Sequence, residues 1–166
     1  SDVVDYPGQW VADIGAGGGF FTFRFAEAVG EDGRVFAVDT DKELLDFIRR
    51  NAAKKGLSNV QVVHASKDEV PLPKRSLDLI FMRNVYHHIE DRVKYARRLK
   101  RLLKPGGKVA IIEYREARHP LLFHSHKLKH YVPREEIIRE MEEAGYRKHV
   151  ELEFLPDQSF IIFTSK

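Results

Sequence analysis

One acid and a cluster of glycines stand where an apolar run gives way to a helical pattern. The apolar run, Trp10 to Ile14, contains Asp13 as its single acid, and glycine occupies four of the five positions 15–19. From Phe20 onward, apolar residues recur at helical spacing. This order predicts a buried strand, a tight turn and a helix, the corner of an open α/β sheet that holds nucleotides. Glycines let a ligand approach the backbone closely there, and the start of the helix presents N–H groups without helical partners.

Two features of this corner distinguish between its candidate ligands. A dinucleotide fingerprint, G-x-G-x-x-G, is matched by Gly15, Ala16 and Gly17, but Phe20 stands in place of its third glycine. Asp13 lies two residues before the first glycine, where its carboxylate would oppose a pyrophosphate and attract an ammonium group. We therefore expect these five residues to bind a ligand with a cationic group. The alternative is a glycine turn that serves only strand-to-helix packing.

The stretch Asp13 to Gly19 resembles the first motif of class I S-adenosylmethionine-dependent methyltransferases, D/E-x-G-x-G-x-G. A second acid, Asp39, follows the next buried strand, 34–38, about 20 residues beyond the glycines, where it can bond both ribose hydroxyls of an adenosine. The family uses an acid in that role. The resemblance thus implies S-adenosylmethionine as cofactor, with its methionine part at Asp13 and its ribose at Asp39. As an alternative, Asp39 is only an additional acid at a helix start.

The helix after Asp39 is expected to border the adenine. Thr40 is predicted as its N-cap, with Glu43 reaching back in a capping box, and the helix ends at Gly56. The resemblance implies that Thr40 and Leu44 lie beside the adenine ring.

The segment after the third strand, 60–64, departs from the family pattern. Family members carry an acid there that binds the adenine amino group, but this position holds Ser66, and Asp68 comes two residues later. Either side chain makes the contact, or the backbone makes it alone. We expect Ser66, Lys67 and Asp68 to lie at the cofactor.

The residues after the fourth strand, 76–82, are candidates for both cofactor binding and catalysis. Because ligands bind beyond the carboxyl ends of the strands, Arg83 and Asn84 should face the glycine turn across one crevice. The sequence N-V-Y-H-H from Asn84 resembles the small-molecule branch of the family, which includes ubiquinone and menaquinone C-methyltransferase-like proteins, and lacks the prolines of the D/N-P-P-Y/F motif in nucleobase methyltransferases. His87 or His88 is the best-placed base, since histidine titrates near neutrality; alternatively, each histidine packs the helix start.

The rest of the chain predicts the remaining elements of one domain, 1–166. A basic helix, 93–103, is ended by the L-K-P-G-G stretch that also marks the family, and a fifth strand is expected over 109–114. A helix from Pro133 through Ala144 and two strands, 146–155 and 159–165, complete the chain. The expected fold is α/β: an open, doubly wound, mostly parallel seven-stranded sheet with an antiparallel last strand.

Composition favours a cytoplasmic globular enzyme. The chain has no cysteine, a net charge of +3 and no apolar run of the roughly 20 residues that a membrane span requires. The basic helix is interpreted as a solvated face, with nucleic-acid contact as the alternative. In the irregular segment 115–132, His126 and His130 have helical metal-ligand spacing, but a loop that borders the substrate is favoured and no metal is expected. Only nine residues precede the first strand, so the lid that many family members carry there is lost or replaced by another segment.

The sequence therefore predicts methyl transfer from S-adenosylmethionine to a small-molecule acceptor, and a nucleic-acid partner is not expected. Three alternatives stay open: an RNA methyltransferase, a nicotinamide oxidoreductase, and a non-catalytic subunit that binds S-adenosylmethionine. The sequence leaves the acceptor and the oligomeric state undetermined.

Overall fold

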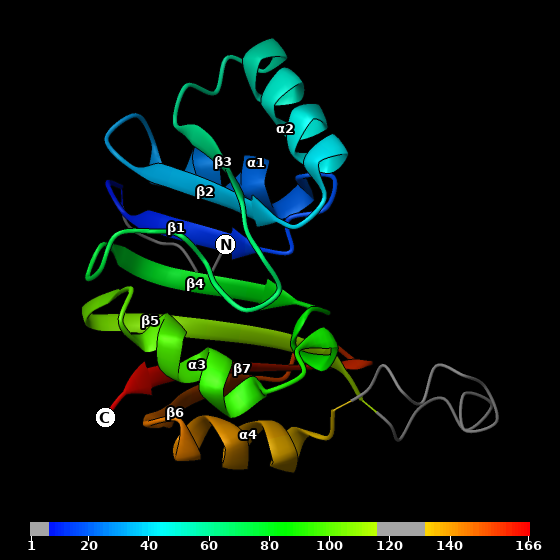
Figure 1. The fold of residues 1–166 in the computed structure, drawn as a ribbon, viewed down its shortest axis with the longest axis vertical. Helices are drawn as coiled ribbons and strands as arrows, with labels where there is room; N and C mark the ends of the chain where they lie inside the picture. The colour runs from blue at the N-terminus through cyan, green and yellow to red at the C-terminus, as the bar shows by residue number, and fades with distance from the viewer. Residues whose placement is uncertain (1–6, 116–131) are drawn as a thin grey trace, which may run out of the picture.

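A single sheet organises residues 7–115 and 132–166, the part of the chain that this computed structural model describes. Its seven strands lie in the order β3-β2-β1-β4-β5-β7-β6 (Figure 1). The strands are β1 (Trp10–Ile14), β2 (Arg34–Asp39), β3 (Val60–His64), β4 (Leu77–Arg83), β5 (Leu103–Tyr114), β6 (Tyr146–Leu152) and β7 (Gln158–Ser165).

The strand directions confirm the predicted fold class. β1 to β5 are parallel, and β7 inserts antiparallel between β5 and β6. The central strands are mostly apolar, as is usual for parallel sheets whose two faces are both covered; Val11 and Ile80, for example, are fully buried. The order of the strands reverses between β1 and β4, so the carboxyl ends of these two strands flank the position where open α/β sheets bind their ligands.

Helices pack on both faces of this sheet. They are α1 (Phe20–Val29), α2 (Lys42–Lys54), α3 (Arg92–Lys100) and α4 (Arg134–Glu143), with a short 3-10 helix η1 (Tyr86–His88) after β4. α3 and α4 lie on the face nearer the viewer in Figure 1, and α1 lies on the far face. α1 is held by Phe25, Ala26 and Val29, which recur at helical spacing and join the apolar cluster of that face.

The predicted N-cap of α2 (Thr40) was wrong. The N-cap of α2 is Asp41, whose side chain accepts from the backbone N–H groups of Glu43 and Leu44, and Thr40 precedes it. The Asp39 carboxylate fixes this choice, since its Oδ1 accepts from the Asp41 backbone N–H at 3.0 Å.

The basic helix also ends earlier than predicted, and the fifth strand begins earlier. α3 stops at Lys100, and Leu103 already pairs with Leu77 of β4. A register shift between Leu77 and Leu79 lets the Pro-Gly-Gly stretch remain within β5. Near the end of the chain, β6 stops at Leu152, three residues before the predicted end. The segment with His126 and His130, which was expected to form a loop bordering the substrate, lies outside the described residues except for Arg115 and Val132.

Candidate active site

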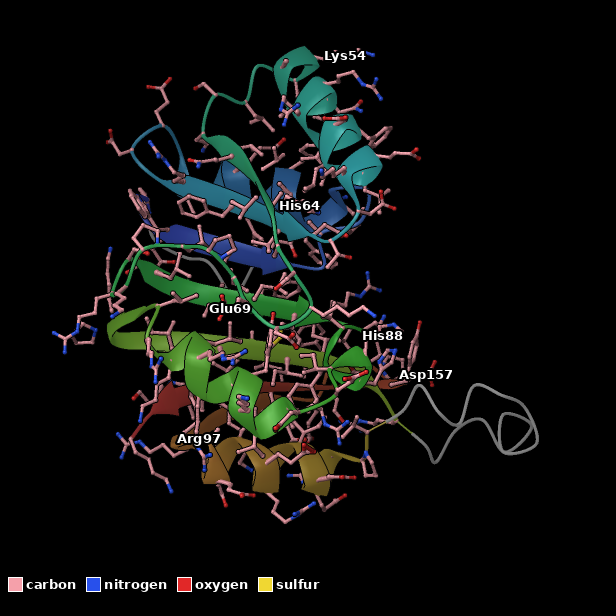
Figure 2. All side chains as sticks on the ribbon, viewed as in Figure 1. Lys54, His64, Glu69, His88, Arg97 and Asp157 are labelled. Atoms are coloured by element: carbon pink, nitrogen blue, oxygen red, sulfur yellow. The ribbon has the colours of Figure 1, made fainter. Side chains whose placement is uncertain are left out.

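A cavity of about 550 Å³ lies at the carboxyl ends of β1 to β4. This volume is within the range of about 300–1,000 Å³ that is usual for small-molecule sites. His88, one of the residues in its wall, is labelled at the carboxyl-end edge of the sheet in Figure 2. Nine residues that the sequence singled out line the cavity: Gly15, Asp39, Thr40, Ser66, Lys67, Asp68, Arg83, Asn84 and His88.

The glycine turn is fixed against β2 and against the loop after β4. The backbone N–H groups of Gly15 and Ala16 both donate to the Val38 carbonyl, at 2.8 and 3.1 Å. Gly15 has a φ of 71°, and a Cβ atom there would lie 2.3 Å from Cγ2 of Val85. Glycine is therefore required at position 15 for two reasons, the left-handed backbone and the close approach of the opposite wall.

Asp39 connects the glycine turn to the start of α2. Its Oδ2 accepts from the Gly17 N–H at 3.0 Å, and its Oδ1 accepts from the Asp41 N–H at 3.0 Å. An ionised carboxylate has about four acceptor positions. The two oxygens of Asp39 thus retain capacity for two further donors, which is what a ribose diol offers.

Asp13 lies beneath the glycine turn and is only 4% exposed. Its Oδ2 accepts from the Thr22 hydroxyl of α1 at 2.7 Å. Burial raises the pKa of the Asp13 carboxyl from 3.8 to about 7; the bond from Thr22 opposes this rise, and the charge of Asp39 adds to it. Two acids therefore flank the glycine turn, and their field favours a cationic ligand over a pyrophosphate.

The loop after β3 forms the wall of the cavity on the side of β2 and β3. The Ser66 hydroxyl accepts from the backbone N–H groups of Asp68 and Glu69, at 3.3 and 3.1 Å, which closes a tight serine turn. Arg98 of α3 donates to the Asp68 carbonyl at 2.8 Å and holds the turn from outside. Ser66 and Asp68 both border the cavity, and the geometry does not decide between them as adenine partners.

The loop after β4 forms the opposite wall. Asn84 has a φ of 57°, a left-handed conformation that is uncommon outside glycine. Its backbone N–H donates to the Ile112 carbonyl at 2.9 Å, and its Oδ1 accepts from Nε2 of Gln158 in β7 at 3.3 Å. This turn directs η1 back over the cavity, where Val85 and His88 join its lining.

The two candidate bases occupy different environments. The His87 side chain is 7% exposed, and its Nδ1 lies 2.9 and 3.1 Å from the carboxylate oxygens of Glu113. His88 is exposed and borders the cavity. The two rings are in contact, with centroids 4.0 Å apart. Of the pair, His88 lines the cavity and His87 does not.

The other predicted site residues do not line the cavity; they are Asp13, Ala16, Gly17, Phe20, Leu44 and His87. Ala16 and Gly17 belong to the turn, and Leu44 lies in the first turn of α2. Phe20 opens α1 with 56% of its surface exposed, and the Arg24 guanidinium stacks 3.6 Å from the centre of its ring.

Sequence reasoning missed Glu113 and several apolar residues of the wall. Glu113 is an acid inside an apolar strand, the same pattern that identified Asp13, so the signal was present. The missed lining residues are the acid Glu90 and the apolar or aromatic residues Ile14, Val38, Ala65, Val85, Ile89 and Tyr95. Apolar residues give no such signal, because Ile14 and Val38 are indistinguishable in sequence from core residues of the same strands.

The polar and apolar groups at this cavity fit S-adenosylmethionine. Asp39 in the lining and Asp13 beneath the glycine turn suit the ammonium and sulfonium groups of its methionine part, and the remaining acceptor capacity of Asp39 suits its ribose. Ile14, Val38 and Ala65 supply an apolar surface of the kind that an adenine ring requires. Among the described residues, no cluster of histidine and acidic side chains is arranged to hold a metal ion.

Comparison with known proteins agrees with this fold and site. A profile of the family described as methyltransferase domain matches residues 7–150. A solved S-adenosylmethionine-dependent methyltransferase from Aquifex aeolicus aligns with a TM-score of 0.87 and 28% identity, over 98% of this chain and 85% of that one. The chain therefore belongs to the methyltransferase domain family, and it is of the class I S-adenosylmethionine-dependent type.

The names of curated relatives include a specific methylation reaction. The ubiquinone/menaquinone biosynthesis C-methyltransferase UbiE of Vibrio vulnificus is 35% identical over 109 residues, which are 65% of this chain and 42% of that protein. The chain thus spans less than half the length of this relative. An arsenic(III) S-adenosylmethionine methyltransferase from Chlamydomonas reinhardtii shares the fold, with a TM-score of 0.77 at 22% identity over 98% of this chain and 65% of that one. Within residues 7–115 and 132–166, no helix has the length and apolar character to cross a membrane.

Proposed function

We propose that residues 1–166 act as one domain that transfers a methyl group from S-adenosylmethionine to a small-molecule acceptor. One observation carries this proposal most directly: Asp13 and Asp39 flank a glycine turn at the head of the cavity. That arrangement suits a ligand with a cationic amino-acid part and a ribose, and it opposes the pyrophosphate of a nicotinamide dinucleotide.

The cofactor would lie along the carboxyl ends of the strands. Asp39 would accept the two ribose hydroxyls, and Asp13 with the backbone of Gly15, Ala16 and Gly17 would hold the methionine part. The adenine would lie between the start of α2 and the loop after β3. That side is formed by Thr40, Leu44, Ser66, Lys67 and Asp68, while Phe20, Arg83 and Asn84 would close the cavity near the methyl group.

Positioning is the main contribution of the protein in this mechanism. S-adenosylmethionine supplies a methyl group on a positively charged sulfur. Holding an acceptor in line with that methyl group is worth roughly 7–11 kcal/mol through orientation. His88 borders the cavity, so we assign it the role of the base that accepts the proton which an oxygen or carbon nucleophile must lose. His87 supports His88 in this role. The name of the Vibrio vulnificus relative supports carbon as the acceptor atom.

The distribution of positive charge argues against RNA as the acceptor. A groove near the amino ends of β4 and β5 is lined by Lys74, Arg75, Arg97, Lys100, Arg101 and Lys104. Arg97 marks this region in Figure 2, far from the carboxyl-end edge where His88 lies. Phosphates bound in that groove would not bring a base to the cavity. A cytoplasmic location also remains part of this proposal.

The test is a transfer assay with methyl-labelled S-adenosylmethionine. One arm offers a panel of small quinols and phenols, and the other offers total tRNA and rRNA fragments at low and physiological salt. We expect label in the small molecules only, and calorimetry should detect micromolar binding of S-adenosylhomocysteine without binding of NAD. Labelled RNA, together with RNA binding that survives physiological salt, would refute the small-molecule proposal. Binding of NAD without S-adenosylhomocysteine would refute the methyltransferase proposal itself.

A further inference from the structure

Glu113, near the carboxyl end of β5, is a fully buried acid to which the preceding mechanism gives no role. Its Oε1 and Oε2 lie 3.1 and 2.9 Å from Nδ1 of His87, and Oε1 also accepts from the His87 backbone N–H at 3.2 Å. One carboxylate thus binds both the ring and the main chain of a single residue in η1.

Retaining a carboxylate at this position is costly. Withdrawing an ionised carboxylate from water carries a penalty of several kcal/mol, and an apolar side chain of similar volume is often as stable or more stable. Burial accordingly raises the pKa of the Glu113 carboxyl, while its bonds with His87 oppose that rise. If this position served only to fill the core, an apolar side chain would be sufficient.

The contacts of η1 connect this buried acid to the cavity. Val85, directly before η1, packs against Gly15 of the glycine turn, and His88, at its end, lines the cavity. The rings of His87 and His88 touch, with centroids 4.0 Å apart. Any rotation of the His87 ring or shift of its backbone would therefore move a wall of the cofactor cavity.

We propose that Glu113 is a positioning residue for methyl transfer: through His87 it fixes the orientation of His88 and of the cavity wall formed by the loop after β4. This inference rests on the function proposed above. Glu113 itself contacts no ligand in this scheme and acts only through His87.

The geometry also sets the proton position on His87. An ionised carboxylate only accepts hydrogen bonds, so beside an ionised Glu113 the Nδ1 atom of His87 must carry a proton. A buried acid that holds a catalytic-site histidine in one tautomer is a recurrent device, and replacing such an acid by its amide leaves the geometry intact but changes the tautomer.

The variant Glu113→Gln tests this assignment. In the amide, Oε1 can still accept from the His87 backbone N–H, which places the NH2 group opposite Nδ1. A donor facing Nδ1 requires the tautomer with the proton on Nε2. Long-range 15N–1H spectra of the imidazole rings distinguish the two tautomers, and they require neither an acceptor nor turnover.

We expect the Nδ1–H tautomer of His87 in the wild-type protein and the Nε2–H tautomer in Glu113→Gln, with displaced His88 signals. Glu151→Gln is the matched control, since Glu151 is a largely buried carboxylate that bonds to Arg134 of α4 and not to η1. That variant should leave both histidine spectra unchanged.

Two results would overturn the proposal: an Nε2–H tautomer of His87 in the wild-type protein, or displacement of the same signals in Glu151→Gln. The wild-type spectrum decides the first point even if Glu113→Gln does not fold. Glu113→Asp, which keeps the acceptor oxygens, should retain the Nδ1–H tautomer. The spectra do not measure methyl transfer. They can therefore refute the role of Glu113 while the transfer assay still supports the proposed function.

Discussion

Replacing Asp13 by asparagine should stabilise the protein increasingly as the pH rises from 4 to 8. The carboxyl has a pKa of about 7 in the folded protein and 3.8 as its ordinary value, so the folded state holds the proton more tightly than the unfolded state. Below pH 3.8 both states are protonated and the group costs nothing. Between these two pKa values the unfolded chain loses its proton first, so the free energy of unfolding falls, and above pH 7 the cost is constant.

The size of this effect follows from the pKa difference. At 1.36 kcal/mol per unit, a shift from 3.8 to about 7 corresponds to about 4 kcal/mol of destabilisation above neutrality. Asparagine has nearly the same shape, can accept from the Thr22 hydroxyl and does not titrate. The difference in unfolding free energy between variant and wild type should therefore increase by about 4 kcal/mol from pH 4 to pH 8.

Urea unfolding, followed by the fluorescence of the single tryptophan, Trp10, measures this difference at each pH. The contributions of other titrating groups cancel because both proteins share them. Asp46→Asn provides the control, since Asp46 is exposed and pairs with the exposed Arg49. A difference for Asp13→Asn that does not change with pH would refute the reasoning, whatever its constant offset.

Two further substitutions test the glycine turn and its acid. Gly15→Ala should destabilise the protein by about 2–5 kcal/mol in urea unfolding, because a left-handed alanine costs about 1–2 kcal/mol and the contact with Val85 adds an overpacking term of about 1–3 kcal/mol. Gly56→Ala shares the positive φ but has no atom within 4 Å of the new Cβ, so it should lose only about 1–2 kcal/mol; equal losses would argue against the contact. Asp39→Ala should weaken S-adenosylhomocysteine binding by about 1.5–3 kcal/mol in calorimetry, the value of a hydrogen bond to a charged group. Unchanged affinity in a folded variant would remove Asp39 as the ribose acid.

The sequence predicted those features that short stretches specify. A strand, a glycine turn and a helix follow one another within 20 residues around Asp13, so hydrophobic period and turn chemistry locate them without knowledge of the rest of the fold. Asp39 could be identified from a short stretch as well, because it ends a strand at the expected spacing from the glycines. The mostly parallel sheet with an antiparallel last strand followed from the same alternation of elements together with the family resemblance.

Features that depend on register between distant strands could not be predicted in this way. The bond between His87 and Glu113 joins residues 26 apart, and that between Asn84 and Gln158 joins residues 74 apart. Each requires β4, β5 and β7 to pair in one particular register. The predicted end of α3 was wrong for a similar reason. Pro105 and two glycines indicated a turn, but the pairing of Leu103 with Leu77 extends the strand through them.

The insertion of β7 between β5 and β6 also has a consequence during synthesis. A chain on the ribosome that has been made only to residue 157 has all the strands that carry the cofactor half of the cavity, but β5 has no neighbour on one side. Its residues Val109 to Ile112 are apolar on both faces, and an open strand of this kind is prone to pair with other chains. The last eight strand residues, from Gln158 to Ser165, both seal that edge and bring the Gln158 amide to Asn84. Until they emerge, we expect the nascent protein to depend on chaperones, and its acceptor side to be incomplete.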